Sequence, residues 1–200
     1  MYSLTKRIFD LAIAIPVLFL FTPVLAVIAL CIRMMDQSQV LFIQKRPGLN
    51  GKPFLMVKFQ TMRDFRDQDG HFLSDELRVT KLGAFLRQTS LDELPSLWNV
   101  IKGEMSLVGP RPLLMEYLPH YSSDQMRRHL VKPGLTGWAQ IHGRNATTWQ
   151  NRFRHDLWYI ENRSIMLDLR ILMHSLIQVF RFDENRPTEP MPRFSENKQL

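Results

Sequence analysis

The residues best suited to chemistry in this sequence lie between positions 87 and 112. An acidic pair, Asp92-Glu93, stands at the predicted start of a short helix, and the stretch ends in a Gly-Pro-Arg-Pro turn that carries Arg111. Adjacent carboxylates repel each other unless cations or a metal ion offset their charge. Arg87 precedes the pair and Arg111 follows it, and arginine forks match phosphate oxygens in two-point fashion. The pattern therefore suits phosphate chemistry better than it suits packing.

Two carboxylates beside cations have two distinct uses in phosphate chemistry. One carboxylate can ligate Mg2+, a hard ion that prefers oxygen ligands. The other can attack phosphorus and form an acyl phosphate. The positive end of a helix dipole favours the ionised form that both roles require. Lys58, near the end of a predicted strand, adds a further cation to the predicted site.

Helix capping is the purely structural interpretation of the same residues. Ser90-x-x-Glu93 matches a capping box, in which Glu93 would hold the start of its own helix. With Ser90 as the cap, Pro95 falls at the fifth helical position, where its missing N–H matters. With Asp92 as the cap, Pro95 falls at the third position, where the N–H has no intrahelical acceptor anyway. The local pattern taken alone favours capping over catalysis.

The elements that would position this site begin with an uncharged apolar run over residues 11–32. A helix over this run is about 33 Å long, close to the thickness of the hydrocarbon core of a bilayer. The run is too long for the apolar region of a typical signal peptide, and no small-x-small cleavage pattern follows it. Pro16 and Pro23 interrupt it, and proline kinks a helix because it lacks a backbone donor. In lipid the freed carbonyls need a local partner, for which the Thr22 hydroxyl is a candidate.

Flanking charges favour a bent membrane segment over a straight span. Basic residues flank the run on both sides: Lys6, Arg7, Arg33, Lys45 and Arg46. Such residues prefer the cytoplasmic side of a membrane. A straight transmembrane helix satisfies this preference at one end only, whereas a helix bent at Thr22-Pro23 satisfies it at both. We therefore predict a re-entrant hairpin, with a simple transmembrane helix as the alternative.

A β-hairpin is predicted downstream of the apolar run. Residues 40–44 and 53–59 have the composition and alternation of strands, with turn residues Pro47-Gly48 and Asn50-Gly51 between them. Residues 63–76 are polar and predict a solvated loop. The stretch 80–87 is predicted to be helical, with one apolar face.

The C-terminal half is predicted to be largely helical. Ser122 or Ser123 can cap one helix, and Thr147 or Thr148 can cap another that runs to about residue 162. Serine and threonine suit these positions because their hydroxyls accept a backbone N–H of the first turn.

Three further segments complete the chain. Residues 132–144 are glycine-rich, which predicts a loop that permits close backbone approach to a ligand. Residues 164–181 form the clearest amphipathic helix, and its apolar face either packs on the core or lies in a membrane interface. The tail, 182–200, is predicted to be extended or partly disordered because it is charged and poor in apolar residues.

Composition limits the classes of protein to consider. The chain has 200 residues, 45% of them hydrophobic, which is enough for one domain plus a small appendage. Its formal net charge of +7 indicates an anionic partner, such as nucleic acid, an anionic membrane surface or a phosphorylated substrate. The basic residues are scattered without a recognition-helix, zinc or aromatic-sheet signature, so no nucleic-acid partner is predicted. The single cysteine, Cys31, allows no intramolecular disulfide, which is consistent with a reducing compartment.

Six ordered sequence blocks cover nearly the whole chain. They are KRIFD at 6–10, QKRPG at 44–48, KFQTM at 58–62, SLDELP at 90–95, GPRP at 109–112 and KPGLTGWAQ at 132–140. Together they resemble the small monotopic phosphoglycosyl transferases of the bacterial sugar transferase family. The closest resemblance is to the bacillosaminyl-phosphate transferases, which use UDP-N,N'-diacetylbacillosamine. The family's bend is usually Ser-Pro, and here it is Thr22-Pro23, which keeps the hydroxyl.

The resemblance implies a reaction and assigns roles to residues. A UDP-sugar would give its sugar 1-phosphate to undecaprenyl phosphate and release UMP. Asp92 would be the nucleophile that forms an aspartyl phosphosugar intermediate, and Glu93 would hold Mg2+ on the diphosphate. The remaining residues implied to bind phosphate or to lie near the site are Lys58, Arg87, Arg111 and Asp168.

The expected fold is α/β, mainly helical with a small β-hairpin, an N-terminal re-entrant membrane helix and interfacial amphipathic helices. Three parts are expected: the membrane helix over 1–35, a catalytic domain over 36–181 and an extended tail over 182–200. The expected location is the cytoplasmic face of the bacterial inner membrane, where a soluble UDP-sugar meets undecaprenyl phosphate among membrane lipids. Downstream glycosyltransferases of glycoprotein or polysaccharide assembly would be further partners.

Two other functions stay open from the residues alone. A membrane-anchored binding or scaffold module would use Asp92-Glu93 only as a cap. A metal-dependent UDP-sugar pyrophosphatase would use the pair without a lipid acceptor. His142, in the glycine-rich loop with Arg144 and Asn145, is a candidate contact to the nucleotide. None of the six histidines has a metal-ligand spacing such as H-E-x-x-H.

Overall fold

The computed structural model describes residues 2–36, 39–142, 148–180 and 194. The elements in chain order are α1 (Tyr2–Asp36), β1 (Leu41–Pro47), η1 (Leu49–Gly51), β2 (Pro53–Phe59), α2 (Asp75–Arg78), α3 (Lys81–Thr89), η2 (Leu91–Ser96), α4 (Leu97–Lys102), β3 (Ser106–Val108), η3 (Met115–His120), α5 (Ser123–Met126), η4 (Arg127–Leu130), β4 (Gly134–Thr136), α6 (Trp138–Ile141), α7 (Trp149–Asn162) and α8 (Ile165–Phe180). The expected fold class, mainly helical with a small hairpin and a long apolar N-terminal helix, is confirmed. A second sheet of two short strands, β3 and β4, was not expected from the sequence.

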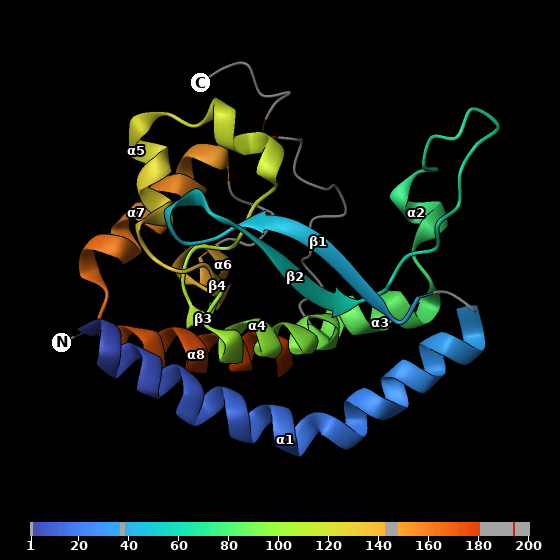
Figure 1. Cartoon of the computed structure of the whole chain (residues 1–200), viewed down its shortest axis with the longest axis horizontal. Helices are drawn as coiled ribbons and strands as arrows, with labels where there is room; N and C mark the ends of the chain where they lie inside the picture. The colour runs from blue at the N-terminus through green and yellow to red at the C-terminus, as the bar shows by residue number, and fades with distance from the viewer. Residues whose placement is uncertain (1, 37–38, 143–147, 181–193, 195–200) are drawn as a thin grey trace.

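Helix α1 runs along the lower edge of the molecule and bends near its middle, with its convex side away from the body (Figure 1). Pro16 and Pro23 both lie inside the helix. The Thr22 hydroxyl donates a 2.8 Å hydrogen bond to the Leu18 carbonyl, an i−4 contact that often accompanies helix bending. The carbonyl that Pro23 leaves without a helical N–H is that of Phe19, so the hydroxyl meets the carbonyl one residue earlier.

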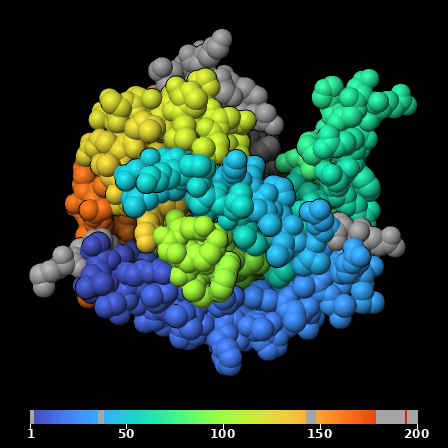
Figure 2. Space-filling view, in the orientation of Figure 1, coloured from blue at the N-terminus to red at the C-terminus, as the bar shows by residue number. Residues whose placement is uncertain are grey.

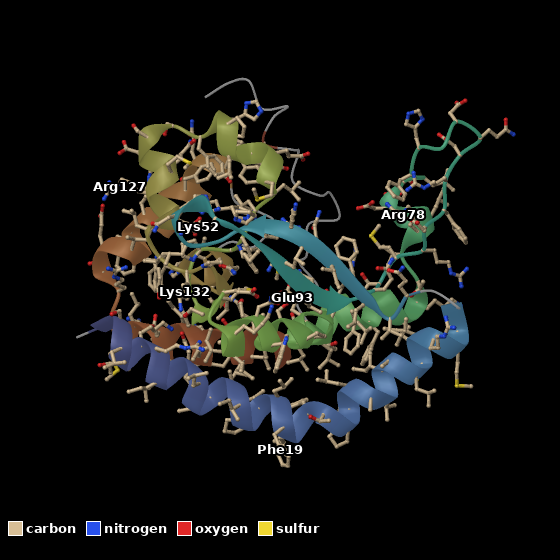
Figure 3. All side chains as sticks on the ribbon, in the orientation of Figure 1. Phe19, Lys52, Arg78, Glu93, Arg127 and Lys132 are labelled. Carbon is tan, nitrogen blue, oxygen red and sulfur yellow. The ribbon has the colours of Figure 1, made fainter. Side chains whose placement is uncertain are left out.

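The outer face of α1 is apolar and exposed. The helix is long and apolar enough over Ser3–Met35 to cross a membrane, and only 11% of its most apolar window is buried in the protein. Phe19, near the bend, is 83% exposed and points away from the body (Figure 3). A core helix of a soluble protein would bury such residues, so this face of α1 is suited to an apolar medium.

A buried ion-pair network fixes the first half of α1 to the body. The Lys6 ammonium lies 2.8 Å from Asp10 Oδ1 and 3.1 Å from Asp168 Oδ2. The Tyr159 hydroxyl donates to Asp168 Oδ1 at 2.7 Å. Asp10 also accepts the backbone N–H of Leu107 at 3.2 Å. Helices α1, α7 and α8 and strand β3 therefore meet at one charged cluster.

The hairpin of β1 and β2 is joined to α4 by one buried amide side chain. Asn99 Oδ1 accepts the Val57 N–H at 3.1 Å, and Asn99 Nδ2 donates to the Leu55 carbonyl at 2.7 Å. Asn99 thereby satisfies backbone groups at the edge of β2, and it is fully buried. The predicted hairpin is confirmed, although β1 extends to Pro47.

Most of residues 132–142, predicted to be a glycine-rich loop, form regular elements that approach the chain itself. Strand β4 pairs in parallel with β3, and α6 follows it. A Cβ on Gly134 would lie 2.1 Å from the Gly109 nitrogen, and a Cβ on Gly137 would lie 2.2 Å from the Gly109 oxygen. Glycine is required because two backbone segments touch here. The loop prediction is therefore wrong for this part, and residues 143–147 lie outside the described chain.

The predicted helix starts are confirmed where the structure describes them. The Thr80 and Thr148 hydroxyls accept backbone N–H groups at the starts of α3 and α7. Ser122 caps α5 in a complete capping box with Gln125. Helix α5 itself is only a single turn and passes into η4.

The apolar face of α8 divides between its two predicted environments. Ile171 is fully buried against the core. Leu169, Met173 and Leu176 are 43%, 53% and 54% exposed. One side of α8 therefore packs on the core, and the other presents apolar side chains at the surface.

Only Phe194 of the predicted tail is described, and it is buried. It packs in an aromatic cluster with Tyr117, Tyr121, Trp149 and Phe153. The other tail residues lie outside the described chain, so the extended or partly disordered tail stays a prediction. Helix α1 ends at Asp36 and α8 at Phe180, and the three-part division of the chain stays a prediction.

Residues 62–80 form an arm that projects from the body (Figures 1 and 2). Isolated bridges pair Met62 with Val79 and Arg66 with Phe72. The guanidinium groups of Arg66 and Arg78 lie 3.9 Å and 4.2 Å from the centre of the Phe72 ring. Cation–π contacts of this kind hold together a stretch that the sequence predicts as a loop.

Replacement of Lys6 by alanine is expected to destabilise the protein by about 3–5 kcal/mol, because two buried carboxylates then lose their cation. The measurement is thermal or denaturant unfolding of the purified protein in detergent. Arg127→Ala is the matched control, since its ion pair with Glu161 is about half exposed, with side chains 44% and 53% exposed, and should change stability by less than about 1 kcal/mol. Equal effects of the two substitutions would contradict the anchoring role of Lys6.

Candidate active site

The acidic pair lies in the 3-10 turn η2, which leads directly into α4. Both carboxylates are in the first turn, as predicted. Ser90, which precedes the turn, has a left-handed backbone with φ 58° and makes no side-chain cap. The Glu93 N–H bonds to the Ser90 carbonyl at 3.2 Å, and the Glu93 side chain turns to cations instead of the helix start. The predicted capping box is therefore wrong, as is Asp92 as the cap.

Glu93 is held between two cations from separate parts of the chain. Its Oε1 lies 2.6 Å from Lys58 Nζ on β2 and 2.6 Å from Arg111 Nη2 on the turn after β3. Its Oε2 accepts a longer bond, 3.3 Å, from Arg111 Nη1. Figure 3 places Glu93 near the centre of the molecule, between β2 and α4. The three residues join the hairpin, η2 and the Gly-Pro-Arg-Pro turn.

The cations keep Glu93 ionised despite its burial. Burial alone would raise its pKa, but the charges of Arg111 and Lys58, with hydrogen bonds from both, lower the pKa to about 2. Glu93 in turn raises the pKa of Arg111. Burial and the charge of Arg111 lower the pKa of Lys58, against the attraction of Glu93.

The pKa of the Asp92 carboxyl is shifted in the opposite direction from that of Glu93. It is only 9% exposed, and no hydrogen bond to its carboxylate is found among the described residues. Burial, followed by repulsion from Glu93, raises its pKa, against the attraction of Lys58, Arg111 and Arg87. A carboxylate that is basic and has no bonded partner is available to attack an electrophile.

Arg87 is brought to the same site but is held more loosely. Its Nε donates to the Thr61 hydroxyl at 2.9 Å, while the side chain as a whole is exposed. The structure therefore brings together five of the predicted site residues: Lys58, Arg87, Asp92, Glu93 and Arg111.

A cavity of about 1730 Å³ extends from the acidic pair. All five of the residues brought together line its charged part. Its apolar part is lined from α1, α3 and α8, including Ile13, Val17, Phe21, Phe85, Leu169 and Leu172. The charged site is therefore continuous with an apolar space beside the long exposed helix.

Two predicted site residues do not line this cavity. Asp168 is fully buried in the Lys6 cluster, where its oxygens contact Lys6 and Tyr159. His142 is exposed, and its Nδ1 lies 2.9 Å from the Trp138 carbonyl. The structure thus gives Asp168 an anchoring position, and contact of either residue with substrate stays a prediction.

Several polar residues on the cavity wall were not predicted from the sequence as site residues, and three of them bear on its chemistry. They are Arg46, Gln140 and Arg152. Among the described residues, Arg46 Nε and both ends of the Gln140 amide are buried without a hydrogen-bond partner. Such groups are costly unless a ligand or water meets them. Arg46 and Gln140 belong to two of the family-like blocks, whereas Arg152 has no sequence signal.

The acidic pair fits a magnesium ion that arrives with a diphosphate. Mg2+ commonly takes one or two protein carboxylates and completes its shell with substrate phosphates and water. Glu93 Oε2 makes only one long hydrogen bond, and the neighbouring Asp92 carboxylate makes none within the described chain. The surrounding arginines disfavour a divalent ion that comes without an anion.

A family model described as bacterial sugar transferase matches residues 1–182. The chain belongs to the bacterial sugar transferase family. The resemblance in the six sequence blocks is thereby confirmed at the level of the family.

Relatives within the family differ in length. The chain is 54% identical over 167 residues to an uncharacterized sugar transferase, EpsL, of Bacillus subtilis, covering 84% of this chain and 83% of the relative. It is 39% identical over 190 residues to a UDP-glucose:undecaprenyl-phosphate glucose-1-phosphate transferase of Xanthomonas campestris, covering 89% of this chain and 39% of the relative. It is 36% identical over 183 residues to a UDP-N-acetylgalactosamine-undecaprenyl-phosphate N-acetylgalactosaminephosphotransferase of Aeromonas hydrophila, covering 88% of this chain and 43% of the relative. The chain spans about two fifths of the last two relatives.

Neutralising the two neighbouring carboxylates is expected to change stability in opposite directions. The depressed pKa of Glu93 contributes stability that is present above its unfolded pKa, near 4.5, and is lost as pH falls toward about 2. The raised pKa of Asp92 contributes stability at low pH that is lost as pH rises through its folded value. At pH 7, Glu93→Gln should therefore lower the melting temperature, and Asp92→Asn should raise it. Melting curves at pH 7 and pH 4 test this, and a fall in both variants at pH 7 would contradict it.

Proposed function

We propose that the protein is a phosphoglycosyl transferase that moves a sugar 1-phosphate from a UDP-sugar to undecaprenyl phosphate and releases UMP. The observation that carries the proposal is the Asp92 carboxylate, which accepts no hydrogen bond from the described residues and is set among cations on the wall of a cavity that continues into an apolar space. Two relatives are named for transfer of glucose 1-phosphate and of N-acetylgalactosamine phosphate with undecaprenyl phosphate. Their names support the same class of reaction for this chain.

In the first half-reaction, Asp92 attacks the β-phosphorus of the UDP-sugar. A bond forms between a carboxylate oxygen and phosphorus as the bond from phosphorus to the bridging oxygen breaks. The electron pair of the broken bond leaves on the phosphate of UMP. Arg111, Lys58 and Arg87 bind the phosphoryl oxygens and offset their charge.

In the second half-reaction, the phosphate of the lipid attacks the same phosphorus. A phosphate oxygen of undecaprenyl phosphate forms the new bond as the acyl phosphate bond breaks. The electron pair returns to the Asp92 carboxylate, which restores the enzyme. The raised pKa of Asp92 suits the attack on phosphorus in the first half-reaction, since a basic carboxylate is a better nucleophile.

Mg2+ bound with the diphosphate would supply charge neutralisation for the departing phosphate. Glu93, with Asp92 beside it, would hold the ion. Glu93 also fixes Lys58 and Arg111 in place, so its carboxylate has an orienting role in addition to binding the metal.

The membrane placement follows from the two substrates. We propose that α1 is a re-entrant helix whose exposed apolar face enters the bilayer from the cytoplasmic side of the bacterial inner membrane. The apolar wall of the cavity, between α1 and α8, suits the polyprenyl chain of the acceptor. The soluble UDP-sugar would reach Asp92 from the cytoplasm. Membrane lipids are therefore constant partners of this arrangement.

The proposal also extends to the identity of the transferred sugar and to the pathway that uses the lipid-linked product. Transfer to undecaprenyl phosphate would be the first membrane step of glycoprotein or polysaccharide assembly, followed by glycosyltransferases that extend the lipid-linked sugar. The resemblance to bacillosaminyl-phosphate transferases makes UDP-N,N'-diacetylbacillosamine one donor to test. UDP-glucose, UDP-galactose and UDP-N-acetylgalactosamine are others, because they stand in the names of relatives.

Asp92→Asn is expected to lower UMP release by at least about 1000-fold and to abolish a trapped phosphosugar enzyme, because the amide cannot act as the nucleophile. The assay uses purified protein, Mg2+, undecaprenyl phosphate and a panel of UDP-sugars, with EDTA in a parallel series. Asp124→Asn is the control, since Asp124 is an exposed aspartate on α5 and should leave the rate unchanged.

Several results would contradict this mechanism. Wild-type UMP release by Asp92→Asn excludes Asp92 as the nucleophile. Sustained turnover without undecaprenyl phosphate indicates a pyrophosphatase. Failure of every UDP-sugar with the lipid present favours a scaffold or binding module.

The re-entrant placement predicts that both ends of α1 face the cytoplasm. Single cysteines at Ser3→Cys and Lys52→Cys, in a Cys31→Ala background, should react with an impermeant maleimide only after spheroplasts are opened. A cysteine at Phe19, near the exposed bend, should stay unlabelled because it lies in lipid. Labelling of position 3 but not position 52 in intact spheroplasts would show a straight span instead.

A further inference from the structure

The cavity holds more positive charge than the acidic pair requires. Arg46, from the end of β1, and Arg152, from α7, line the same cavity as Arg111. Glu93 is already bonded to Arg111 and Lys58. Neither Arg46 nor Arg152 is among the site residues predicted from the sequence.

Arg46 is held by neutral acceptors only. Its Nη2 donates to Gln44 Oε1 at 2.6 Å, and its Nη1 donates to the Pro112 carbonyl at 3.3 Å. Its Nε is buried without a hydrogen-bond partner, and no carboxylate within the described chain forms an ion pair with it. A guanidinium in this position has both charge and a donor left for a ligand.

Arg152 is the second additional cation on the wall of the cavity. Its guanidinium lies 5.1 Å from the centre of the Trp149 ring, which holds the side chain in a fixed direction. Asp156, whose charge partly offsets the lowering of the pKa of Arg152 by burial, is bonded to Arg128 at 2.7 Å. Asp156 is therefore shared with a cation that is itself almost fully buried.

Arg111 is close enough to repel both Arg46 and Arg152. Burial, and then the charge of Arg111, lower the pKa of Arg46 to about 10 and also lower the pKa of Arg152. Charges of one sign in a partly buried cavity are costly unless an anion joins them. Arg111 contacts Glu93 and is the common neighbour of both arginines, so an anion at Arg46 and Arg152 would lie beside the reacting phosphate.

We propose that Arg46 and Arg152 form a second anion subsite, which binds a phosphate monoester next to the phosphoryl group transferred by Asp92. This inference rests on the proposed function for the identity of the ligands. The departing UMP and the phosphate of the acceptor lipid share this chemistry. Both would use the subsite in turn, because the acceptor oxygen attacks the phosphorus from the side on which UMP left.

The test uses the 200-residue protein in nanodiscs and five variants. Arg46→Gln and Arg152→Gln remove the cations of the subsite. Lys45→Gln and Arg154→Gln are matched controls, since these exposed residues lie next to Arg46 on β1 and on α7 and do not line the cavity. Binding of inorganic pyrophosphate and of UMP is measured by calorimetry, and KM for undecaprenyl phosphate is measured in the turnover assay.

Each subsite variant is expected to weaken binding of UMP and pyrophosphate about 10- to 100-fold, the range for hydrogen bonds to a charged group. The controls should stay within about twofold of wild type. Arg46→Lys should recover part of the binding because it keeps the charge. If both ligands use the subsite, the KM for the lipid should rise and the affinity for UMP should fall in the same variants. If only one of these two quantities changes, the subsite is assigned to the corresponding ligand.

Two results would overturn the proposal. One is unchanged binding of UMP, pyrophosphate and lipid in both subsite variants. The other is equal loss in Arg46→Gln and Arg46→Lys together with a fall in melting temperature, which indicates a structural role through the Pro112 carbonyl. Pyrophosphate binding needs no turnover, so the subsite can be confirmed even when every UDP-sugar fails as a donor. Failure of the subsite is thereby distinguished from failure of the proposed function.

Discussion

The ion pairs of Glu93 with Lys58 and Arg111 are the contacts on which the site depends. They join a strand of the hairpin, the turn that carries the acidic pair and the Gly-Pro-Arg-Pro turn. The carboxylate is largely buried, so loss of either cation would leave a charge without compensation. The same contacts bring positive charge next to Asp92 without a hydrogen bond to it. The same charged residues therefore stabilise the fold of the site and surround the carboxylate that would react.

A second charged cluster fixes this site relative to the long apolar helix. Lys6 holds Asp10 and Asp168 together beneath β3, and this fixes the first half of α1 relative to the core. The bend near Thr22 then turns the second half of the helix back toward the body (Figure 1). The apolar wall of the cavity includes side chains of this helix. The position of Asp92 relative to the exposed apolar face of α1 is thus set by buried ion pairs and by a helix bend.

Local patterns in the sequence predicted what depends on local interactions. The hairpin, the caps at Ser122 and Thr148, and the long apolar helix are all visible in composition and spacing. The capping box at Ser90 failed because two distant cations compete for the Glu93 side chain, and spacing along the chain carries no information about them. The glycine-rich stretch failed for a related reason. Its glycines meet Gly109, a residue far away in the sequence, rather than a ligand.

The site residues also divide into those that local sequence patterns predict and those that only the packing of distant segments brings to the site. Asp92, Glu93 and Arg111 were found because they are close in sequence and belong to recognisable blocks. Arg152 had no signal, since only the packing of α7 brings it to the cavity. Asp168 shows the converse, because the family resemblance placed it near the site while the structure gives it buried structural partners.

The two neighbouring carboxylates show how one short turn can separate two roles. Asp92 is buried, Glu93 is largely buried, and both lie in the first turn of η2. What differs is bonding: Glu93 receives hydrogen bonds from two cations, and Asp92 receives none within the described chain. Their pKa values are therefore moved in opposite directions from similar starting values. A permanently ionised carboxylate is suited to hold cations, and a more basic one is suited to attack.

The arginines on either side then have a further task, because each phosphate that enters must be neutralised without protonating the nucleophile. Guanidinium groups meet this requirement, since they carry charge at every relevant pH and donate without being acids in this range.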